Sequence, residues 1–337
     1  MHNITNKILT NVTDFIPPPI TLGGGKNHFL GEKMENTKIL KKRKDLNVTV
    51  FIISMLIVPI ISFLFFYVYI NFNSILLAFQ VPLYDGLGGF EIGLQNFETV
   101  IKQFTNTDDK FFSYLRNTLI YFCQDTFINM PLSLIICYFI YKKIAFSKVL
   151  RVIIYLPIIM TPTIVSVLFK FMIEAGGPLQ AICGTADIAL PNTFIQDEQY
   201  ALRTILFYSI YSGLGARFVL FGGAMNSIDI SVIEAGKLDG VGPFRELVSI
   251  IVPCIWPTFG TMLLISFTGV FTASGPSLLF DPDGRFGTMS ISYWIYTKTT
   301  GTGSQPELAS ATGLVFTLLG LPIVFIVKKL TKITEGN

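Results

Sequence analysis

Two ionisable residues, Asp125 and Arg217, lie deep inside apolar stretches of this sequence. A charged side chain at that depth costs about 3 kcal/mol or more unless it is paired or faces water, and it usually faces the interior of a helix bundle. Other hydrogen-bonding side chains lie close to them in the sequence: Gln124, Asn129, Tyr208, Tyr211 and Ser212. Because amide, hydroxyl and phenol groups can bind a polar solute, all these residues are candidates for a solute path through a membrane.

Three arrangements of the two charges are open at this level. Asp125 and Arg217 pair with each other, or Arg217 extends to the nearer membrane surface, or both line a cavity. In the last case Tyr211 would stack on the apolar face of a sugar ring. An Arg217 without Asp125 beside it would favour an anionic solute.

The sequence gives no sign of a metal site in the membrane, of nucleic-acid binding, of a nucleotide-binding loop or of a disulfide framework. Both histidines, His2 and His28, precede the first apolar stretch, which leaves no histidine for a metal site in the membrane. The net charge of +3 gives no reason to expect nucleic-acid binding. The phosphate-binding pattern G-x-x-x-x-G-K-[ST] is absent, because Gly23-Gly24-Gly25-Lys26 has the wrong spacing. The cysteines are scattered and form no C-x-x-C pair: Cys123, Cys137, Cys183 and Cys254.

The apolar stretches are long enough to cross a membrane. Apolar residues make up 51% of the chain and charged residues 14%, against about 25% charged residues in soluble domains. A helix needs about 20 apolar residues to span the hydrocarbon core. Six stretches qualify: 48–70, 114–141, 149–173, 201–225, 250–272 and 309–328. Prolines within several of them fit a packed bundle, in which neighbouring helices satisfy the carbonyls that proline leaves free.

Lysine and arginine gather in three segments outside these stretches: before residue 48, between the second and third stretches, and after the sixth. Basic residues favour the cytoplasmic side, and an even number of spans places all three segments there. We therefore expect a multi-pass protein of the cytoplasmic membrane with both termini cytoplasmic. Its parts would be a polar tail over 1–47 that forms no packed core, a transmembrane domain over 48–330, and a short tail over 331–337.

A polar segment separates the fourth and fifth stretches and would face the cytoplasm: EAGKLDGVGPFRELVSIIVP. Ser231 and Glu234 fit a capping box at the start of a short helix. That helix would stop at Asp239-Gly240, where glycine can adopt a left-handed conformation, and Pro243 would start a second helix. Such a helical hairpin is either a solvated connector or an element that docks into another protein.

The segment resembles the EAA loop of ABC importer permeases, which reads E-A-A-x-x-D-G-A, then a hydrophobic residue, then I-x-L-P. The matching residues are Glu234, Ala235, Asp239, Gly240, Leu247, Ile250 and Pro253. Gly236 and Val241 replace the second and third alanines of that pattern. Glycine costs about 1 kcal/mol of helix propensity relative to alanine, so Gly236 is expected to loosen the first helix.

The resemblance covers most of the chain from Lys41 onward. Ile92–Phe97 is similar to the G-L-x-N-[FY] stretch after the first span of carbohydrate permeases, and Arg116–Leu119 is similar to the opening of their next span. Leu150–Pro157 resembles the entry to the third span, and Gly275-Pro276 resembles the turn after the fifth. These features resemble the maltose-type, F-like first member of a permease pair.

The resemblance implies an all-α polytopic membrane protein with six transmembrane helices of the type I ABC importer permease fold. It also implies a cytoplasmic EAA coupling loop at about 229–253, which docks into an ATP-binding subunit through Glu234, Ala235, Gly236, Asp239, Gly240, Leu247 and Pro253. The implied partners are a second permease subunit, two ATP-binding subunits, an extracellular solute-binding protein and the lipid bilayer. The chain would be no enzyme and hold no cofactor, because ATP and Mg²⁺ would bind the partner subunits.

Two other classes of function stay open. A stand-alone secondary transporter would need its own ion-coupling acids in the membrane, and Asp125 is the main one present. An intramembrane enzyme would need a nucleophile paired with a base, or a metal cluster. If the resemblance holds, the solute is a sugar, an oligosaccharide, a uronate or a glycerol phosphate.

Overall fold

The structure is a computed structural model that describes residues 48–83, 89–105, 110–184, 194–271, 275–300 and 303–331. The predicted tails lie outside these residues, except for Thr331, which ends the last helix. The chain divides into two compact units, residues 1–70 and 71–337. The boundary falls inside the first long helix, and each unit is described by itself.

The first span is a helix over Val48–Ala78, which continues past the predicted end at residue 70. It includes a π-helical stretch, Phe63–Tyr69, and ends as α3 (Ile70–Ala78). Within the first unit the apolar side chains of this helix are exposed, as expected for a surface that faces lipid.

A two-stranded antiparallel sheet that the sequence did not predict follows the first span. β1 (Gln80–Leu83) pairs with β2 (Gly89–Ile92), with Gln80 opposite Ile92. Asn96, in α4 (Gln95–Thr105), donates from its side chain to the carbonyls of Ala78 and Gln80 at 3.1 and 2.8 Å. The asparagine of the G-L-x-N-[FY] stretch therefore fixes the corner between the helix and the sheet.

The second span runs from Phe111 to Tyr141, so it begins three residues before the predicted start at residue 114 and ends as predicted, with a change of helical pitch in the middle. α5 (Phe111–Cys123) and α6 (Met130–Tyr141) are joined by a π-helical stretch, Gln124–Asn129. Pro131 lies at the start of α6 and donates no backbone hydrogen bond to the preceding turn, which accounts for the wider turn there. The π-helical stretch carries Gln124, Asp125 and Asn129, three of the candidate path residues.

The prediction of one continuous third span over 149–173 is wrong. The chain forms α7 (Ser147–Ile159) and α8 (Pro162–Ile173), separated by Met160 and Thr161 in extended conformation. The ring of Pro162 disfavours a helical residue before it, so α7 ends there. The spanning candidate is Pro162–Cys183, which includes part of α9 (Pro178–Gly184).

The fourth span, α10 (Glu198–Asn226), is continuous, but the predicted fifth span over 250–272 is bent. One arm comprises α12 (Pro243–Glu246), a π-helical stretch over Leu247–Ile251 and α13 (Val252–Cys254). The other arm is α14 (Trp256–Gly269), and the two arms differ in direction by 79°. Pro253 and Pro257, four residues apart in sequence, both lack a backbone donor near the bend at Ile255.

The remaining helices are α11 (Ile230–Leu238), α15 (Ser277–Phe280), α16 (Ile291–Thr300) and α17 (Pro306–Thr331). The described part of the chain thus holds five long apolar helices plus one bent pair, which agrees with the predicted number of six spans although the bounds of the third differ. α17 is the sixth of these spans.

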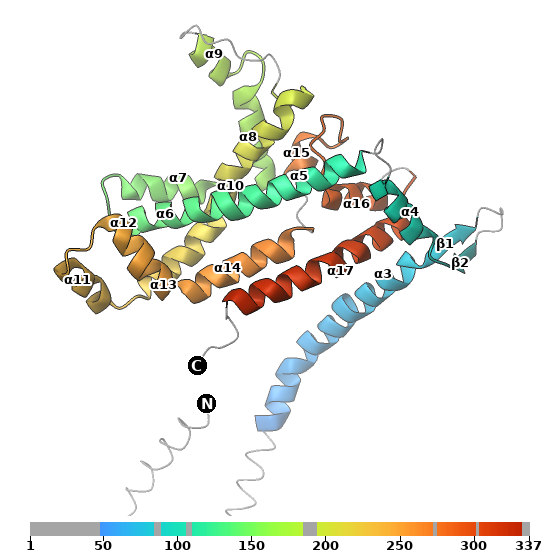
Figure 1. The fold of residues 1–337 in the computed structure, drawn as a ribbon, viewed down its shortest axis with the longest axis horizontal. Helices are drawn as coiled ribbons and strands as arrows, with labels where there is room; N and C mark the ends of the chain where they lie inside the picture. The colour runs from blue at the N-terminus through green and yellow to red at the C-terminus, as the bar shows by residue number, and fades with distance from the viewer. Residues whose placement is uncertain are drawn as a thin grey trace, which may run out of the picture. The chain divides into compact units, whose positions relative to one another are not determined.

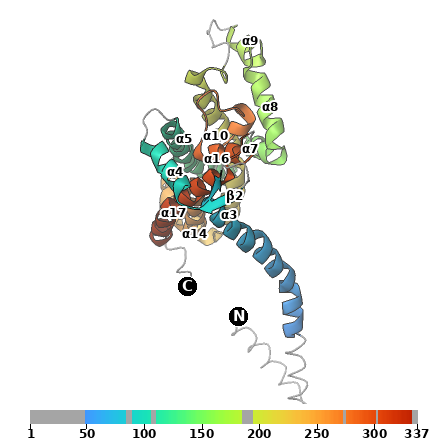
Figure 2. The same cartoon turned by 90° about the vertical axis from the view of Figure 1, so that its right-hand side faces the viewer.

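Within residues 71–337, α10 packs along α6 and α7, and α14 packs along α17 (Figures 1 and 2). Figure 1 places α11 and α12 at the α6 end of the second span, whereas α4 and α16 lie at the α5 end. One apolar cluster joins Met130, Phe221 and Met225 of α6 and α10 to Ile233 and Ile251 of the polar segment's hairpin. The hairpin is therefore packed against the spans.

Candidate functional site

A cavity of about 310 Å³, lined by both apolar and polar side chains, lies between the second, fourth and fifth spans. Small-molecule sites usually have volumes of roughly 300–1,000 Å³, so this cavity has room for one small group. Four of the predicted path residues line it: Gln124, Asp125, Asn129 and Arg217. The rest of the lining is Thr118, Tyr121, Phe122, Ser209, Gly213, Ile265, Ser266, Gly269, Val270, Gly275 and Pro276.

Asp125 and Arg217 form an ion pair inside this cavity. Ser266 of α14 donates to Asp125 Oδ2 at 3.2 Å and accepts from Arg217 Nη2 at 3.3 Å. Of the arrangements that the sequence left open, the structure forms the paired one, and the pair also lines the cavity. Sequence reasoning missed Ser266, because a single serine in an apolar span carries no signal of its own.

Asn129 is 3% exposed, and its amide is only partly satisfied. Its Nδ2 donates to the carbonyl of Ser209 at 3.2 Å, while Oδ1 has no hydrogen-bond partner among the described residues. Gly213 makes this position possible, because a Cβ atom there would lie 2.6 Å from Asn129 Nδ2. Gln124 Nε2 donates to the carbonyl of Leu206 at 2.7 Å, which ties the second span to the fourth.

The other three predicted path residues lie outside this cavity. Tyr208 is buried against Phe169 and Phe280, and its hydroxyl donates to the carbonyl of Pro162 at 3.4 Å. The Tyr211 hydroxyl donates to the carbonyl of Ile153 on α7 at 3.2 Å. Ser212 is half-buried on α10. All three lie on the same helix as Arg217 without lining the cavity, so Tyr211 is not placed to stack on a ring there.

The second candidate site is the segment 229–253, called the coupling segment here after the role that the sequence predicts for it. The predicted capping box is wrong, because α11 begins one residue before Ser231 and its cap is Asp229, which accepts from the Ser231 amide at 3.0 Å. Glu234 is then too far along the helix to complete a box. The predicted stop is confirmed, since Gly240 has φ of +70°. Pro243 starts α12 as predicted.

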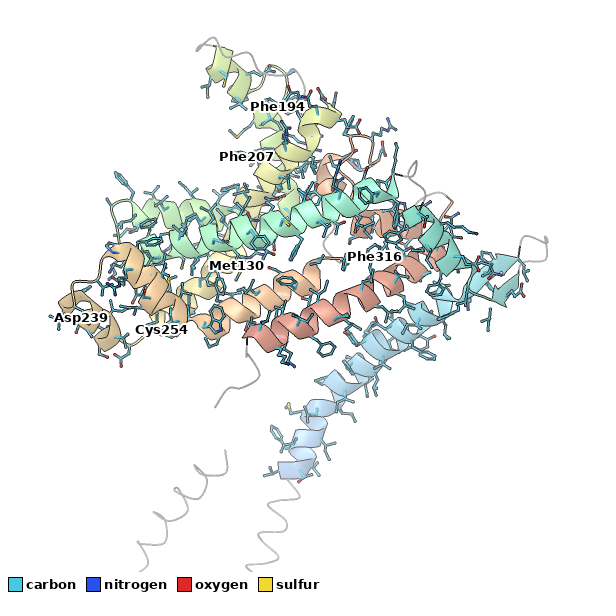
Figure 3. The ribbon with its side chains drawn as sticks, viewed as in Figure 1. Met130, Phe194, Phe207, Asp239, Cys254 and Phe316 are labelled. Carbon is cyan, nitrogen blue, oxygen red and sulfur yellow. The ribbon has the colours of Figure 1, made fainter. Side chains whose placement is uncertain are left out.

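The outward face of the coupling segment is exposed and partly apolar. Leu238 is 90% exposed, Phe244 80% and Ile230 68%, and the predicted residues Glu234, Ala235 and Asp239 are exposed as well. Figure 3 shows Asp239 at the outer end of the hairpin and Cys254 where the segment returns to the spans. Pro253 is exposed beside that return.

The inward face of the coupling segment is buried against the spans. Leu247 is 7% exposed and belongs to the same apolar cluster as Met130, and buried Glu246 pairs with Lys142 at 2.8 Å. A Cβ atom on Gly236 would lie 2.5 Å from Ile250 Cδ1, so glycine allows the two helices of the hairpin to approach closely. The glycine that weakens the propensity of α11 thus contributes packing instead.

Residues 116–334 of the chain match a family profile described as "Binding-protein-dependent transport system inner membrane component". The sn-glycerol-3-phosphate transport system permease protein UgpA of Pectobacterium atrosepticum is 25% identical over 71% of this chain and 80% of its own length. The lactose transport system permease protein LacF of Rhizobium radiobacter is 26% identical over 57% of this chain and 66% of its own length.

The fold is also that of a solved structure, a bacterial ABC transporter involved in the import of the acidic polysaccharide alginate. The TM-score is 0.73 at 20% sequence identity, with 88% of this chain and all of the matched chain covered. The predicted all-α permease fold is therefore confirmed. Of the three classes of function that the sequence left open, the importer permease is the one that the family match supports, because the profile covers more than half of the sequence. The stand-alone secondary transporter and the intramembrane enzyme are not supported. The chain belongs to the family of binding-protein-dependent transport system inner membrane components.

Proposed function

We propose that this chain is one of two permease subunits of an ATP-driven importer and that its path carries a sugar or a related polyol. Two ATP-binding subunits supply the energy, with ATP and Mg²⁺ bound to them. An extracellular binding protein delivers the solute. The family membership and the names of the relatives support this assignment, since those relatives are named as permeases for glycerol 3-phosphate and lactose.

The observation that carries the proposal is the two-faced coupling segment. Its inner face is held to the second span through apolar packing and the Glu246–Lys142 ion pair, while Leu238 and Phe244 project almost fully exposed. Exposed aromatic and aliphatic side chains next to acids are typical anchors of a protein interface. A segment with this construction can bind a partner on one face and transmit its movement to the spans through the other.

We infer that the coupling segment faces the cytoplasm, in a chain of the cytoplasmic membrane with both termini on that side. The basic residues of the connection after the second span lie at the same end of that span as α12, since Lys142 contacts Glu246. A bias of lysine and arginine marks the cytoplasmic side of a membrane protein.

The test is recovery of ATP-binding subunits with the tagged chain from membranes that contain the whole complex. A charge at the exposed tip, in Leu238→Glu or Phe244→Glu, should abolish that recovery while the six spans stay intact. Ile92→Glu is the matched control, because Ile92 is 84% exposed and lies on β2 at the opposite end of the second unit. Full recovery of ATP-binding subunits with both tip variants would overturn the proposed docking surface.

A further inference from the structure

The cavity between the second, fourth and fifth spans carries no net charge. Its lining contains one cation, Arg217, and one anion, Asp125, and the two are paired. The Arg217 side chain is 15% exposed and the Asp125 side chain 37% exposed, so the cation is the more enclosed partner. Arg217 Nη1 also donates to the carbonyl of Gly213 at 3.5 Å, which holds the guanidinium against its own helix.

The cavity offers hydrogen-bond acceptors to a ligand. Asn129 Oδ1 is buried and has no partner among the described residues, an arrangement that costs free energy unless a ligand or a water donates to it. Both contacts of the Asp125 carboxylate, from Arg217 and Ser266, fall on Oδ2. Oδ1 therefore stays available to accept from a second hydroxyl.

We propose that this cavity accepts an uncharged polyhydroxy group, such as one neutral sugar ring, and that Asp125 determines this selectivity by cancelling the charge of Arg217. The inference rests on the proposed function and names the solute class of the same path. Ligand hydroxyls donate to Asn129 Oδ1 and Asp125 Oδ1, which satisfies both acceptors without breaking the ion pair.

An anionic group is disfavoured at the same position. It would either separate Arg217 from Asp125, which leaves a carboxylate without its partner, or place a second negative charge beside that carboxylate. The relatives are named for solutes of both kinds: glycerol 3-phosphate and polygalacturonan or rhamnogalacturonan on one side, and the neutral disaccharide lactose on the other. The solved structure with the same fold belongs to an importer of the acidic polysaccharide alginate. The argument for a neutral solute therefore rests on the Asp125–Arg217 ion pair of this chain.

The experiment measures the charge preference of the cavity directly. Ser209 lines the cavity, and its carbonyl accepts from Asn129 while its hydroxyl donates only to the carbonyl of Ile205 in its own helix at 2.8 Å. Ser209→Cys therefore places a reactive thiol there without breaking a side-chain contact between spans. In the complete complex, with the four native cysteines replaced, this thiol is modified by three methanethiosulfonate reagents of similar size. One reagent is anionic (sulfonatoethyl), one cationic (trimethylammonium ethyl) and one neutral (hydroxyethyl).

We expect no preference for the anionic reagent over the neutral one in the paired cavity. Asp125→Asn should raise the rate with the anionic reagent about tenfold relative to the neutral reagent, because an uncompensated cation in a cleft concentrates anions. The double variant Asp125→Asn with Arg217→Gln should return that ratio to its original value. Ser249→Cys, on the exposed surface of the coupling segment, should keep the same ratio in every background.

A second measurement uses protection of the Ser209→Cys thiol by galactose or by galacturonate. We expect galactose to slow modification, and galacturonate to do so only after Asp125→Asn. Protection by galacturonate in the paired cavity, protection by neither sugar, or a preference for the anionic reagent before any change at Asp125 would overturn the inference. If Asp125→Asn does not assemble, the reagent and protection assays on the paired cavity still decide it. Recovery of ATP-binding subunits from the same preparation tests the proposed function separately.

Discussion

Lys142 Nζ donates to both carboxylate oxygens of Glu246, at 2.9 and 2.8 Å. Lys142 directly follows α6 in the second span, and Glu246 ends α12 in the coupling segment. The Glu246 side chain is 5% exposed and that of Lys142 25%. The ion pair therefore ties the coupling segment to the same span that carries Asp125 in the cavity.

Removal of this pair should destabilise the complex and weaken its coupling. Glu246→Gln leaves the partly buried Lys142 without its counter-ion, which should cost about 3 kcal/mol. We expect a lower midpoint of thermal unfolding, and less uptake for each ATP hydrolysed. The matched control is Glu98→Gln, since the Glu98–Lys102 pair is 3.8 Å long and largely exposed, and its loss should cost less than about 1 kcal/mol. Equal midpoints for the two variants would mean that the buried pair contributes no more than a surface pair.

The turn at Gly240 should tolerate only residues that accept positive φ. No atom lies within 4 Å of a Cβ placed on Gly240, so its φ of +70° is the only constraint on a substitution. Gly240→Val should abolish uptake because β-branched residues disfavour that conformation, while Gly240→Asn should retain most of it. Uptake and solute-stimulated ATP hydrolysis measure the two variants side by side. Normal coupling in Gly240→Val would contradict the role of the turn.

The cap of α11 should depend on pH through Asp229 and not through Ser231. The backbone amide of Ser231, followed by its side chain, lowers the pKa of Asp229 below the usual 3.8. The cap therefore stabilises α11 above the unfolded-state pKa, and this contribution is lost as pH falls through the lower folded-state value. We expect amide exchange in α11, corrected for the intrinsic rate, to speed up between about pH 6 and about pH 3.

Two variants separate this cap from the capping box that the sequence suggested. Asp229→Asn should keep α11 protected at both pH values, because asparagine also caps helices and does not titrate there. Ser231→Ala keeps the backbone amide that makes the larger contribution, so it should keep most of the protection of α11 at pH 6. If Ser231→Ala lost the protection of α11 and Asp229→Ala kept it, Ser231 would be the cap, as the capping box predicts.

The predicted topology places Cys183 and the coupling segment on opposite sides of the membrane. In a chain that retains Cys183 alone, a membrane-impermeant thiol reagent should label it from outside the cell. A cysteine in place of exposed Ser249 should react only after the cytoplasmic face is opened. Labelling of both positions from the same side would refute the orientation.

Sequence reasoning located the parts of this fold that depend on composition and on glycine and proline. Hydropathy found the number of spans but not the bounds of the third, and the glycine and proline of the hairpin predicted the turn at Gly240 and the start of α12 at Pro243. Both features are local, because they depend on backbone conformations that few residues permit.

The misses arose where several neighbouring residues compete. Thr161 directly precedes Pro162, and Ile255 lies two residues from both Pro253 and Pro257. Neither residue marks a break by its own type, so the apolar stretches predicted from hydropathy continued across both breaks. Asp229 and Ser231 are both good caps, and only the helix start in the structure distinguishes them. The cavity pairing of Asp125 and Arg217 was one of three open arrangements, and Ser266 entered the site only through packing between α14 and the second span.

The most direct test of the account is the energy source of transport. The complete complex, reconstituted in liposomes with its binding protein, is supplied with the solute that the copurified binding protein carries, identified by mass spectrometry. We predict uptake that requires ATP on the side of the coupling segment and continues after ionophores collapse the proton and sodium gradients. Uptake that proceeds without ATP and stops with those gradients would contradict the assignment of this chain as the permease of an ATP-driven importer.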